Sequence, residues 1–518
     1  MSIKREHWGG TFGFVMASAG SAIGLGNVWK FPYVTGVNGG GAFVLIYLAS
    51  ILCVGLPVML AEMAIGRAAQ SDVIGSFKHF GKNSLLPRFI GGYGLGLATM
   101  LFFYGSYGVG CVVAIISLLF FKFGWGFAGF SASVVPLLIL SYYAMIGGWF
   151  FIYTGKALSG DLRFANVEQA KEVFLDVAGN GSMTALFTLI FLLCCAVVCW
   201  FGVQKGLEMA SKVMMPALFV LIVVLAVRGV TLEGATKGIS FLLKPDFNKL
   251  TTHGVLEAMG HSFFTLSLGM GIVVTYGSYL SKKQSILKSA LWVCILDTCI
   301  SLLAGLAIFP AVFAVGMNPG AGPGLIFNIL PVTFQAMPGN LSVLWNTLFF
   351  ILMLLAALTS GMSLLEVGIA SAMTQWHWSR KKSVLILTII IMCLSVLSSF
   401  SNISWESLPL IKDFLVASFG TVKGSFMDQL DYICSNWMLP LNGLASAVFV
   451  GWIWGAGKAV RELYRQVPGE PMVALTKAER LKVVLSRQVP IRSWAFFVLF
   501  VSPILVLITF LFATGFFS

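Results

Sequence analysis

The sequence predicts an all-α polytopic membrane protein, and three observations support this fold class. Of the 518 residues, 58% are hydrophobic and only 10% are charged, whereas ordinary soluble domains carry about 25% charged residues. The apolar residues form long continuous runs, unlike the alternating segments of a membrane β-barrel. The basic residues behind the net charge of +13 lie mainly in short loops between those runs, as the positive-inside rule describes. A soluble enzyme, a disordered scaffold and a nucleic-acid partner are therefore not expected.

Twelve apolar runs approach the length of about 20 residues that a helix needs to cross a bilayer. They are residues 11–36, 41–66, 89–121, 125–156, 183–203, 208–230, 254–280, 286–316, 342–373, 383–401, 427–454 and 494–517. The last run is expected to be the final transmembrane helix. The polar segment before it, 455–493, is rich in Lys and Arg and is expected in the cytoplasm.

Loop charges predict a cytoplasmic N-terminus and one segment that is not a simple crossing. Lys and Arg cluster at five sites expected on the cytoplasmic side: residues 4–5, 67–88, 205–212, 282–288 and 380–382. A basic cluster at 228–249 disagrees with this assignment. Three apolar runs lie between the loops 67–88 and 205–212, so one of them must return to its starting side. The glycine-rich run 89–121 is the candidate for a re-entrant, membrane-embedded element packed against protein.

Two runs carry small and polar residues where a crossing helix should be continuous. Residues 20–27 read Gly-Ser-Ala-Ile-Gly-Leu-Gly-Asn, and residues 263–271 again combine hydroxyls with glycines. Close helix packing through small residues is one interpretation. The other is a broken helix, whose free carbonyls bind a cation and whose half-helix N-terminus faces an anion. Two such interruptions in corresponding halves favour the second, because they are typical of a transporter site.

Further polar residues lie within apolar runs. Asp297 lies between Leu296 and Thr298, and an intramembrane carboxylate indicates a functional site. Thr359 and Ser360 add hydroxyl oxygens in another run. Oxygen ligands of this kind suit a hard cation such as sodium better than a transition metal.

Several motifs closely resemble those of the neurotransmitter:sodium symporter family. They lie at residues 4–8, 24–32, 38–43, 141–149, 264–271, 275–279 and 428–432. The resemblance covers nearly the whole chain outside 89–121. It implies a LeuT-like fold of two inverted five-helix repeats, at 8–230 and 235–454, with helices 1 and 6 unwound. One extra C-terminal helix and the inserted membrane-embedded segment 89–121 would complete it.

The resemblance also implies two sodium sites and a substrate site. Sodium 1 would be held, with the substrate carboxylate, by Ala22, Asn27, Thr265 and Asp297. Sodium 2 would be held by Gly20, Ile23, Ala356, Thr359 and Ser360. The substrate would contact Ser21, Ala22, Leu25, Gly26, Ile139, Tyr143, Phe264, Thr265, Ser267, Met270, Ser360 and Leu364. Tyr143 is expected to hydrogen-bond the substrate carboxylate, and Phe264 to close over the substrate.

The gates implied by the resemblance differ from the family pattern. Lys30 and Asp431 resemble the outer gate pair, with lysine in place of the usual arginine, so a bidentate fork is lost. His261 replaces the usual glutamine beside that gate. The inner gate would comprise Arg5, Trp8, Ser278 and Tyr279. Thr374 stands where an aspartate normally pairs with Arg5, which would weaken inner closure or give Arg5 another partner.

The sequence therefore predicts sodium-coupled uptake of a neutral, hydrophobic or aromatic amino acid by alternating access. No chloride requirement is expected, because Asp297 supplies a fixed negative charge. A non-transporting amino-acid sensor on the same fold is the alternative, favoured only by the missing inner-gate aspartate. No nucleophile–base pair supports a membrane enzyme. The protein is expected in a bacterial cytoplasmic membrane, surrounded by lipid, as a monomer or weak homodimer.

Overall fold

The computed structural model describes most of the chain. The described residues are 6–82, 84–86, 95, 99, 114, 117–119, 121–317, 324–337, 339, 341–400, 412, 424–463 and 493–514. Within them the structure is helical, and a single isolated β-bridge joins Gly40 to Pro245. Arg5, almost all of the run 89–121 and most of the basic segment 455–493 lie outside the described residues.

Nine helices among the described residues are long and apolar enough to cross a membrane. In chain order they are α3–α4 (Gly41–Ala69), α8 (Trp125–Ser159), α10 (Gly181–Trp200), η3–α11 (Val203–Val230), α15 (Ile286–Ala314), α17 (Ser342–Gln375), α18 (Arg380–Phe400), α20–α22 (Phe426–Leu463) and η9–α24 (Ser493–Ala513). A tenth span consists of α1 (Thr11–Ala22) and η1–α2 (Gly26–Val37), bent by 49° at the break between them. Another interrupted element consists of α13 (Thr252–Thr265) and α14 (Ile272–Ser278).

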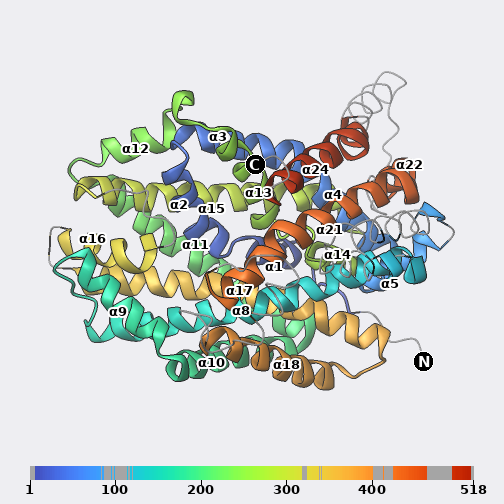
Figure 1. The fold of residues 1–518 in the computed structure, drawn as a ribbon, viewed down its shortest axis with the longest axis horizontal. Coiled ribbons are helices and arrows are strands. Elements are labelled where there is room, and N and C mark those ends of the chain that lie inside the picture. The colour runs from blue at the N-terminus through green and yellow to red at the C-terminus, as the bar shows by residue number, and fades with distance from the viewer. Residues whose placement is uncertain are drawn as a thin grey trace.

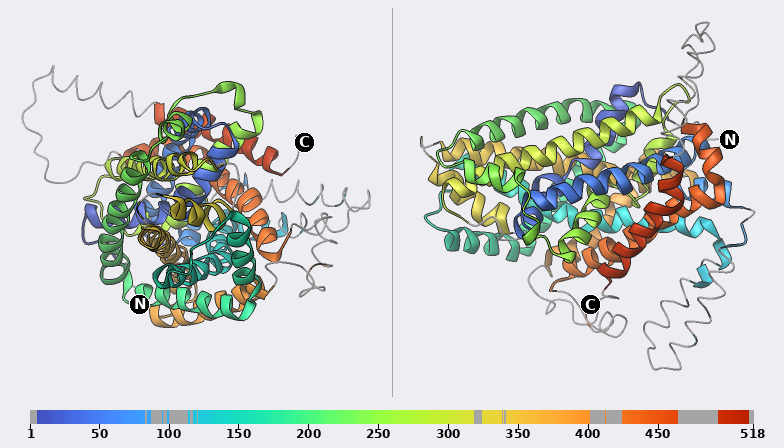
Figure 2. Two further views of the ribbon diagram at one scale, coloured as in Figure 1. Left: turned by 90° about the vertical axis from the view of Figure 1, so that its left-hand side faces the viewer. Right: turned by 90° about the horizontal axis from the view of Figure 1, so that it is seen from above.

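The crossing helices run side by side along the long axis of the bundle (Figure 1), and the end-on view shows them packed around one another (Figure 2). Short helices mark the two ends. The amphipathic helix α5 (Val73–Gly81) lies at the end that holds the N-terminus, whereas α9 (Val167–Gly179), α12 (Thr236–Leu243) and α16 (Leu330–Ala336) lie at the opposite end. The sequence had not predicted these end helices. We refer below to the N-terminal end and the opposite end.

Both flanks of the segment between residues 82 and 122 lie at the N-terminal end. Lys82 and Lys122 line the same cavity of about 550 Å³, together with Lys78 of α5. The chain therefore leaves and returns at one end of the bundle, as the loop charges predict. Membrane embedding of 89–121 itself stays a prediction.

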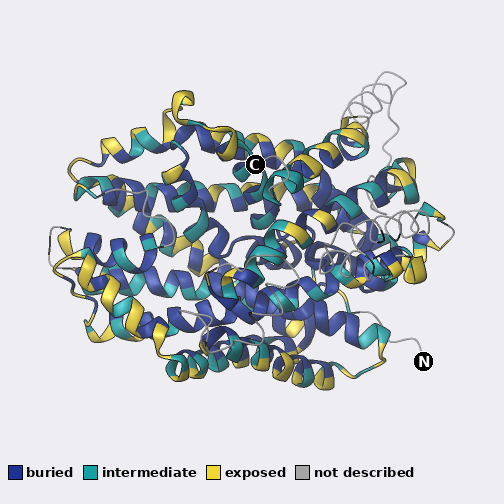
Figure 3. Cartoon of the chain, viewed as in Figure 1, coloured by how far each residue is buried: buried dark blue, intermediate teal, exposed yellow. Residues whose placement is uncertain are grey.

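The outer faces of the bundle are apolar. Leu186 and Leu193 of α10, Val213 and Val220 of α11 and Trp292 of α15 are all exposed on the surface, and Figure 3 shows exposed positions along the outer helices around a buried interior. The spacing of seven residues in α10 and α11 puts each pair on one helix face. Large apolar faces of this kind belong in lipid, so the protein is an integral membrane protein.

The two helix breaks lie beside each other near the middle of the bundle. After α1, Ile23 adopts an extended conformation, and a Cβ on Gly24 would collide with Ser360 of α17. Between α13 and α14, Ser267, Gly269 and Gly271 all have positive φ, at 54°, 72° and 67°. A hydrogen bond of 3.0 Å from the Ser267 hydroxyl to the Ser21 carbonyl joins the two breaks.

Candidate substrate and ion site

A small cavity of about 30 Å³ lies between the two breaks, α8 and α17. It is lined by all of the residues that the sequence assigned to the substrate: Ser21, Ala22, Leu25, Gly26, Ile139, Tyr143, Phe264, Thr265, Ser267, Met270, Ser360 and Leu364. Gly24 and Ile272 also line it and were not assigned there. The structure thus brings the twelve together around one cavity, while their role in binding stays a prediction.

The cavity has an apolar part and one available polar group. Ile139, Met270 and Leu364 supply aliphatic and thioether surface, and the described lining residues include no Lys, Arg, Asp or Glu. The Tyr143 hydroxyl is buried beside the Ser360 side chain and the Leu25 backbone, but it makes no hydrogen bond of good geometry to a described residue. A buried polar group without a partner costs about 1–3 kcal/mol. A ligand oxygen that accepted this hydrogen bond would remove that cost.

A second polar cluster lies beside the cavity, where Asn27 meets α15. The Asn27 amide nitrogen donates to Asp297 Oδ1 at 2.7 Å and to the Ser301 hydroxyl at 2.9 Å. The Tyr47 hydroxyl donates to Asp297 Oδ2 at 3.0 Å and lies 3.4 Å from Thr265 Oγ1. The proposed sodium 1 residues Asn27, Thr265 and Asp297 therefore converge, and Ala22 lies at the adjoining break.

The Asp297 carboxylate has hydrogen-bond donors but no cationic side chain beside it among the described residues. It is fully buried, and among the described residues it forms no ion pair with Lys, Arg or His. An unpaired ion of this kind inside a membrane protein is costly. Tyr47, which the sequence analysis did not single out, completes the cluster. A lone tyrosine in an apolar run carries no signal that separates this role from packing.

The proposed sodium 2 residues gather where α1 approaches α17. The Ser360 hydroxyl lies 3.4 Å from the Gly20 carbonyl, and the Thr359 hydroxyl lies 3.0 Å from the Ala356 carbonyl. Ile23 follows directly after the end of α1, where its extended backbone leaves the helix. The Ser360–Gly20 contact joins the two helices, whereas the Thr359–Ala356 contact lies within α17. None of the five proposed residues carries a charged side chain.

The outer-gate residues lie near one another but are not paired. A cavity of about 420 Å³ is lined by Lys30 and Phe264, and Phe264 also lines the small cavity. The Lys30 ammonium lies 5.1 Å from the centre of the Phe264 ring. Asp431 instead accepts hydrogen bonds from Tyr142 at 2.9 Å and Ser435 at 2.8 Å, and no ion pair joins it to Lys30. Phe264 therefore separates the small cavity from a larger vestibule.

The N-terminal end of the site is closed by aromatic packing. The Trp8 indole donates to the Tyr276 carbonyl at 3.1 Å, and its backbone N–H donates to the Tyr279 carbonyl at 3.2 Å. Its ring also makes edge contacts with both tyrosines. Ser278 lies between these two tyrosines in the sequence and is buried, and its hydroxyl donates to the Thr275 carbonyl. Trp8, Ser278 and Tyr279 thus lie together, whereas Arg5 lies outside the described residues.

Glu62 of α4 supports the α13–α14 break. One oxygen of its buried carboxylate accepts the Gly269 N–H at 3.0 Å and the Ser446 hydroxyl at 3.1 Å. The Asn442 amide donates to the Gly269 carbonyl at 3.0 Å. The backbone N–H and the backbone carbonyl of Gly269 are therefore both satisfied by side chains, as unwound backbone inside a membrane protein requires.

Known proteins match the chain over most of its length. The model of the sodium:neurotransmitter symporter family matches residues 5–124 and 169–475. An uncharacterized sodium-dependent transporter of Bacillus subtilis (strain 168) is 33% identical over 462 residues, covering 86% of this chain and 88% of that protein. An uncharacterized sodium-dependent transporter of Haemophilus influenzae is 30% identical over 512 residues, covering 98% of each chain.

A solved structure is also similar. The crystal structure of MhsT in complex with L-phenylalanine has a TM-score of 0.77 and 35% sequence identity, and the match covers 98% of this chain and 100% of that one. We expected the resemblance to be interrupted at 89–121, but the family model instead omits 125–168. That range contains α8, whose Tyr143 nevertheless lines the central cavity.

These matches confirm the fold and the class of protein. The interrupted helices and the likeness to MhsT establish the LeuT-like fold. The relatives are transporters, so the chain is a transporter and not an enzyme. The chain belongs to the sodium:neurotransmitter symporter family and is a sodium-dependent transporter of the membrane.

Proposed function

We propose that this protein is a symporter that uses sodium to import a neutral, hydrophobic or aromatic amino acid by alternating access. The observation that carries the proposal is the composition of the central cavity. It combines the buried Tyr143 hydroxyl, which has only poorly aligned contacts with Ser360 and Leu25, with apolar surface. Its described lining has no countercharge for an acidic or basic side chain. The Tyr143 hydroxyl would donate to the substrate carboxylate, and Ile139, Met270 and Leu364 would contact its side chain.

The similar structure supports this choice of substrate, because MhsT was crystallised with L-phenylalanine. A cavity of about 30 Å³ holds little more than a water molecule. Binding must therefore enlarge it. Phe264 is the side chain we expect to move, since it lines both this cavity and the vestibule beyond it. Met270 adds a flexible thioether that can adapt to substrates of different shape.

Two sodium ions are part of the proposal. Sodium 1 would be held by Ala22, Asn27, Thr265 and Asp297, where a buried carboxylate has no cationic partner among the described residues. Sodium 2 would be held by the carbonyl and hydroxyl oxygens between α1 and α17. Because Asp297 offsets one positive charge permanently, we propose that transport needs no chloride.

The remaining expectations complete the proposed arrangement. The N-terminal end would face the cytoplasm, in a bacterial inner membrane, and the vestibule would face outward. The repeats would span 8–230 and 235–454, and the protein would act as a monomer or weak homodimer. The repeat boundaries are supported by the positions of the two broken helices, one near the start of each half.

Binding of tritiated phenylalanine to the purified protein in detergent tests the proposal. We expect saturable binding in sodium and a loss of at least about tenfold in affinity when potassium or choline replaces it. Leucine, methionine, tyrosine and tryptophan should include effective competitors, whereas glutamate and lysine should not compete. Equal binding in all three salts, or tight binding of glutamate or lysine alone, would refute the proposal.

A pair of tyrosine variants on the same helix tests the site itself. Tyr143→Phe should weaken phenylalanine binding by at least about tenfold, because it removes a hydrogen bond to a charged group, worth about 1.5–3 kcal/mol. Tyr153→Phe is the matched control: its hydroxyl is also buried on α8 without a partner among the described residues, but it packs against Phe327 and Phe350, away from the cavity. Equal losses in both variants would remove Tyr143 from the site.

A further inference from the structure

Two cavities of different character adjoin at the N-terminal end of the bundle. The first, of about 550 Å³, is lined by Lys78 of α5, by Lys82 just after it and by Lys122 before α8. The second, of about 360 Å³, is lined mainly by apolar side chains of α8, α17 and α18. Lys78, Phe123 and Gly126 line both. We refer to them as the lysine cavity and the apolar cavity.

Lys78 lies at the junction of the two cavities. Its aliphatic stem passes so close to Gly126 of α8 that a Cβ added to this glycine would lie 2.8 Å from two of its carbon atoms. Its ammonium donates to Gln375 Oε1 of α17 at 3.5 Å. A lysine can pack its stem on apolar surface while its charge stays in polar surroundings. Lys78 therefore adds both an apolar and a charged surface to the junction.

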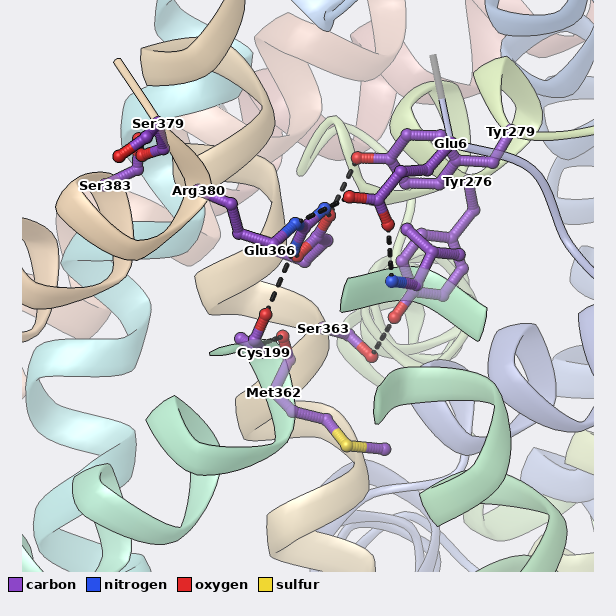
Figure 4. Close-up of polar contacts among 11 residues, drawn as sticks. Glu6, Cys199, Tyr276, Tyr279, Met362, Ser363, Glu366, Ser379, Arg380 and Ser383 are labelled. Carbon is purple, nitrogen blue, oxygen red and sulfur yellow. Dashed lines mark hydrogen bonds and ion pairs between the residues drawn. The ribbon is translucent and has the colours of Figure 1, made fainter. Parts of the chain in front are cut away.

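The positive charge of the lysine cavity is not balanced by the described residues. Their linings of the two cavities include no Asp or Glu, and the three lysines form no ion pair with them. Other basic residues at this end are paired within the protein. Arg380 binds Glu6 and Glu366 (Figure 4), and Arg67 binds Glu462. The lysine cavity thus favours an anion.

Hydrogen-bond donors also meet the lysine cavity. Helix α8 begins at Trp125, and Gly124, Trp125 and Gly126 all line this cavity. Gly124 has no side chain to cap the helix, whose first N–H groups attract anions. The Trp125 side chain is only 4% exposed, and its indole N–H makes no hydrogen bond to a described residue. A buried donor without an acceptor is costly, and a phosphate oxygen would supply one.

The apolar cavity lies at the outer surface of the bundle. Phe127 and Leu137 of α8 and Leu387 of α18 line it. Phe130 and Trp376, which also line it, are 47% and 58% exposed. Large aromatic residues exposed near the end of a membrane bundle are typical of the lipid headgroup level. The apolar cavity is therefore suited to an acyl chain, next to a cavity suited to its phosphate.

We propose that the two cavities together bind one anionic phospholipid of the cytoplasmic leaflet, such as phosphatidylglycerol. Its phosphate would lie in the lysine cavity and accept hydrogen bonds from Trp125 and the first turn of α8. One acyl chain would lie in the apolar cavity. The Ser371 hydroxyl lines that cavity, is buried and has no hydrogen-bond partner among the described residues, so it would donate to an ester carbonyl. The choice of leaflet rests on the proposed orientation, whereas the site itself does not depend on transport.

Native mass spectrometry of the purified protein, titrated with lipid in detergent, tests the proposal. Phosphatidylglycerol should bind at least about tenfold more tightly than phosphatidylethanolamine with the same acyl chains, because a lysine near an anionic headgroup contributes about fivefold in affinity. The double variant Lys82→Gln/Lys122→Gln should therefore weaken phosphatidylglycerol binding by about 25-fold. Trp125→Phe, which keeps a ring against Phe449 and loses the N–H, should weaken it by about tenfold.

Two matched controls alter the opposite end of the bundle. Lys237→Gln/Lys244→Gln removes the same charge from and just after α12. Trp345→Phe removes another buried indole N–H that has no hydrogen-bond partner among the described residues. Both should bind phosphatidylglycerol as the unmodified protein does. Equal losses in the test and control variants, or equal affinity for the two lipids, would overturn the proposal.

Two further arms identify the occupant. Inorganic phosphate in excess should not displace phosphatidylglycerol, because it has no acyl chain; displacement would indicate a site for soluble anions and contradict a lipid site. Phosphatidylglycerol with a photoreactive diazirine in one acyl chain should crosslink to α8, α17 or α18 around the apolar cavity, and less so in Trp125→Phe. Crosslinks confined to residues 89–121 would mean that this segment fills the apolar cavity, and would also refute the proposal.

Discussion

At the scale of single residues, charge compensation around Asp297 determines how the ion site works. Its carboxylate is fully buried and receives hydrogen bonds from Asn27 and Tyr47. Hydrogen bonds disperse a negative charge but do not neutralise it. A bound sodium ion would do so, and it would share oxygen ligands with the substrate carboxylate. Coupling between ion and substrate would then follow from electrostatics at one point.

Asp297→Asn tests this coupling. The variant keeps the shape of the side chain and removes the charge. We expect sodium affinity in chloride-free medium to fall at least about 100-fold, since loss of the partner of a buried ion costs about 3 kcal/mol or more. Chloride should restore part of it. The measurement is phenylalanine binding against sodium concentration in gluconate and in chloride. The control is Asp246→Asn, at a half-buried position in the loop after α12. Unchanged sodium dependence without chloride would contradict this explanation.

Gly24 offers a steric test of the cavity. An added methyl group would collide with Ser360 and lie 3.3 Å from the Tyr143 hydroxyl. Overpacking a close contact costs about 1–3 kcal/mol, so Gly24→Ala should lower substrate affinity by about tenfold. Gly155→Ala on α8, where a Cβ meets nothing within 4 Å, should bind normally. Normal binding by Gly24→Ala, measured in the same assay, would show that this part of the cavity does not contact substrate.

At the scale of elements, the two interrupted helices provide the site. Their non-helical backbone must be stabilised by other residues. Ser267 adopts a left-handed conformation that only glycine and a few polar residues tolerate readily. Gly269 donates a hydrogen bond to Glu62 and accepts one from Asn442, and these two bonds stabilise the break between α13 and α14. Substrate and ion ligands therefore depend on residues that do not line the cavity.

Glu62 variants test this support. Glu62→Ala leaves the Gly269 N–H and the Ser446 hydroxyl without their acceptor, and each buried donor left unsatisfied costs about 1–3 kcal/mol. We expect it to lower the apparent melting temperature in detergent clearly. Glu62→Gln keeps the accepting oxygen and should lose much less stability. Equal losses, followed by thermal unfolding in sodium, would show that the charge of Glu62 matters more than these hydrogen bonds.

The sequence was sufficient for the parts of the structure that depend on local pattern. Apolar length predicts the crossing helices, and glycines beside hydroxyls predict both breaks. It could not predict α9, α12 and α16, whose short patterns depend on packing at the end of the bundle. Tyr47 was also missed, because it sits singly in an apolar run and gains its partners only through tertiary contacts. Lys30 and Asp431 were expected to pair, yet Tyr142 and Ser435 already bind the carboxylate.

At the scale of the whole molecule, the basic residues and the two closures of the cavity are arranged along the long axis of the bundle. The N-terminal end holds Lys78, Lys82 and Lys122, and the opposite end holds α9, α12 and α16. A protein with this topology would separate its two openings by the central cavity. The vestibule beside Lys30 would serve one side, and the packing of Trp8 on Tyr276 and Tyr279 would close the other.

Cysteine labelling, compared between intact cells and inverted membrane vesicles, tests the topology. Cysteines replacing Lys82 and Lys122 should both react with an impermeant thiol reagent from the cytoplasmic side only, in a background without reactive native cysteines. Lys244→Cys, just after α12, should react from outside. Labelling of Lys122→Cys from outside would mean that residues 89–121 cross the membrane fully.

Uptake by proteoliposomes tests the central claim most directly, because it separates a symporter from a sensor that only binds. Purified protein is reconstituted, and tritiated phenylalanine is supplied outside with sodium outside and potassium inside. We predict accumulation above the external concentration, which disappears when sodium is equal on both sides or when choline replaces it. Sodium-dependent binding without accumulation or exchange of labelled substrate, or equal uptake driven by a proton gradient in the absence of sodium, would contradict the account.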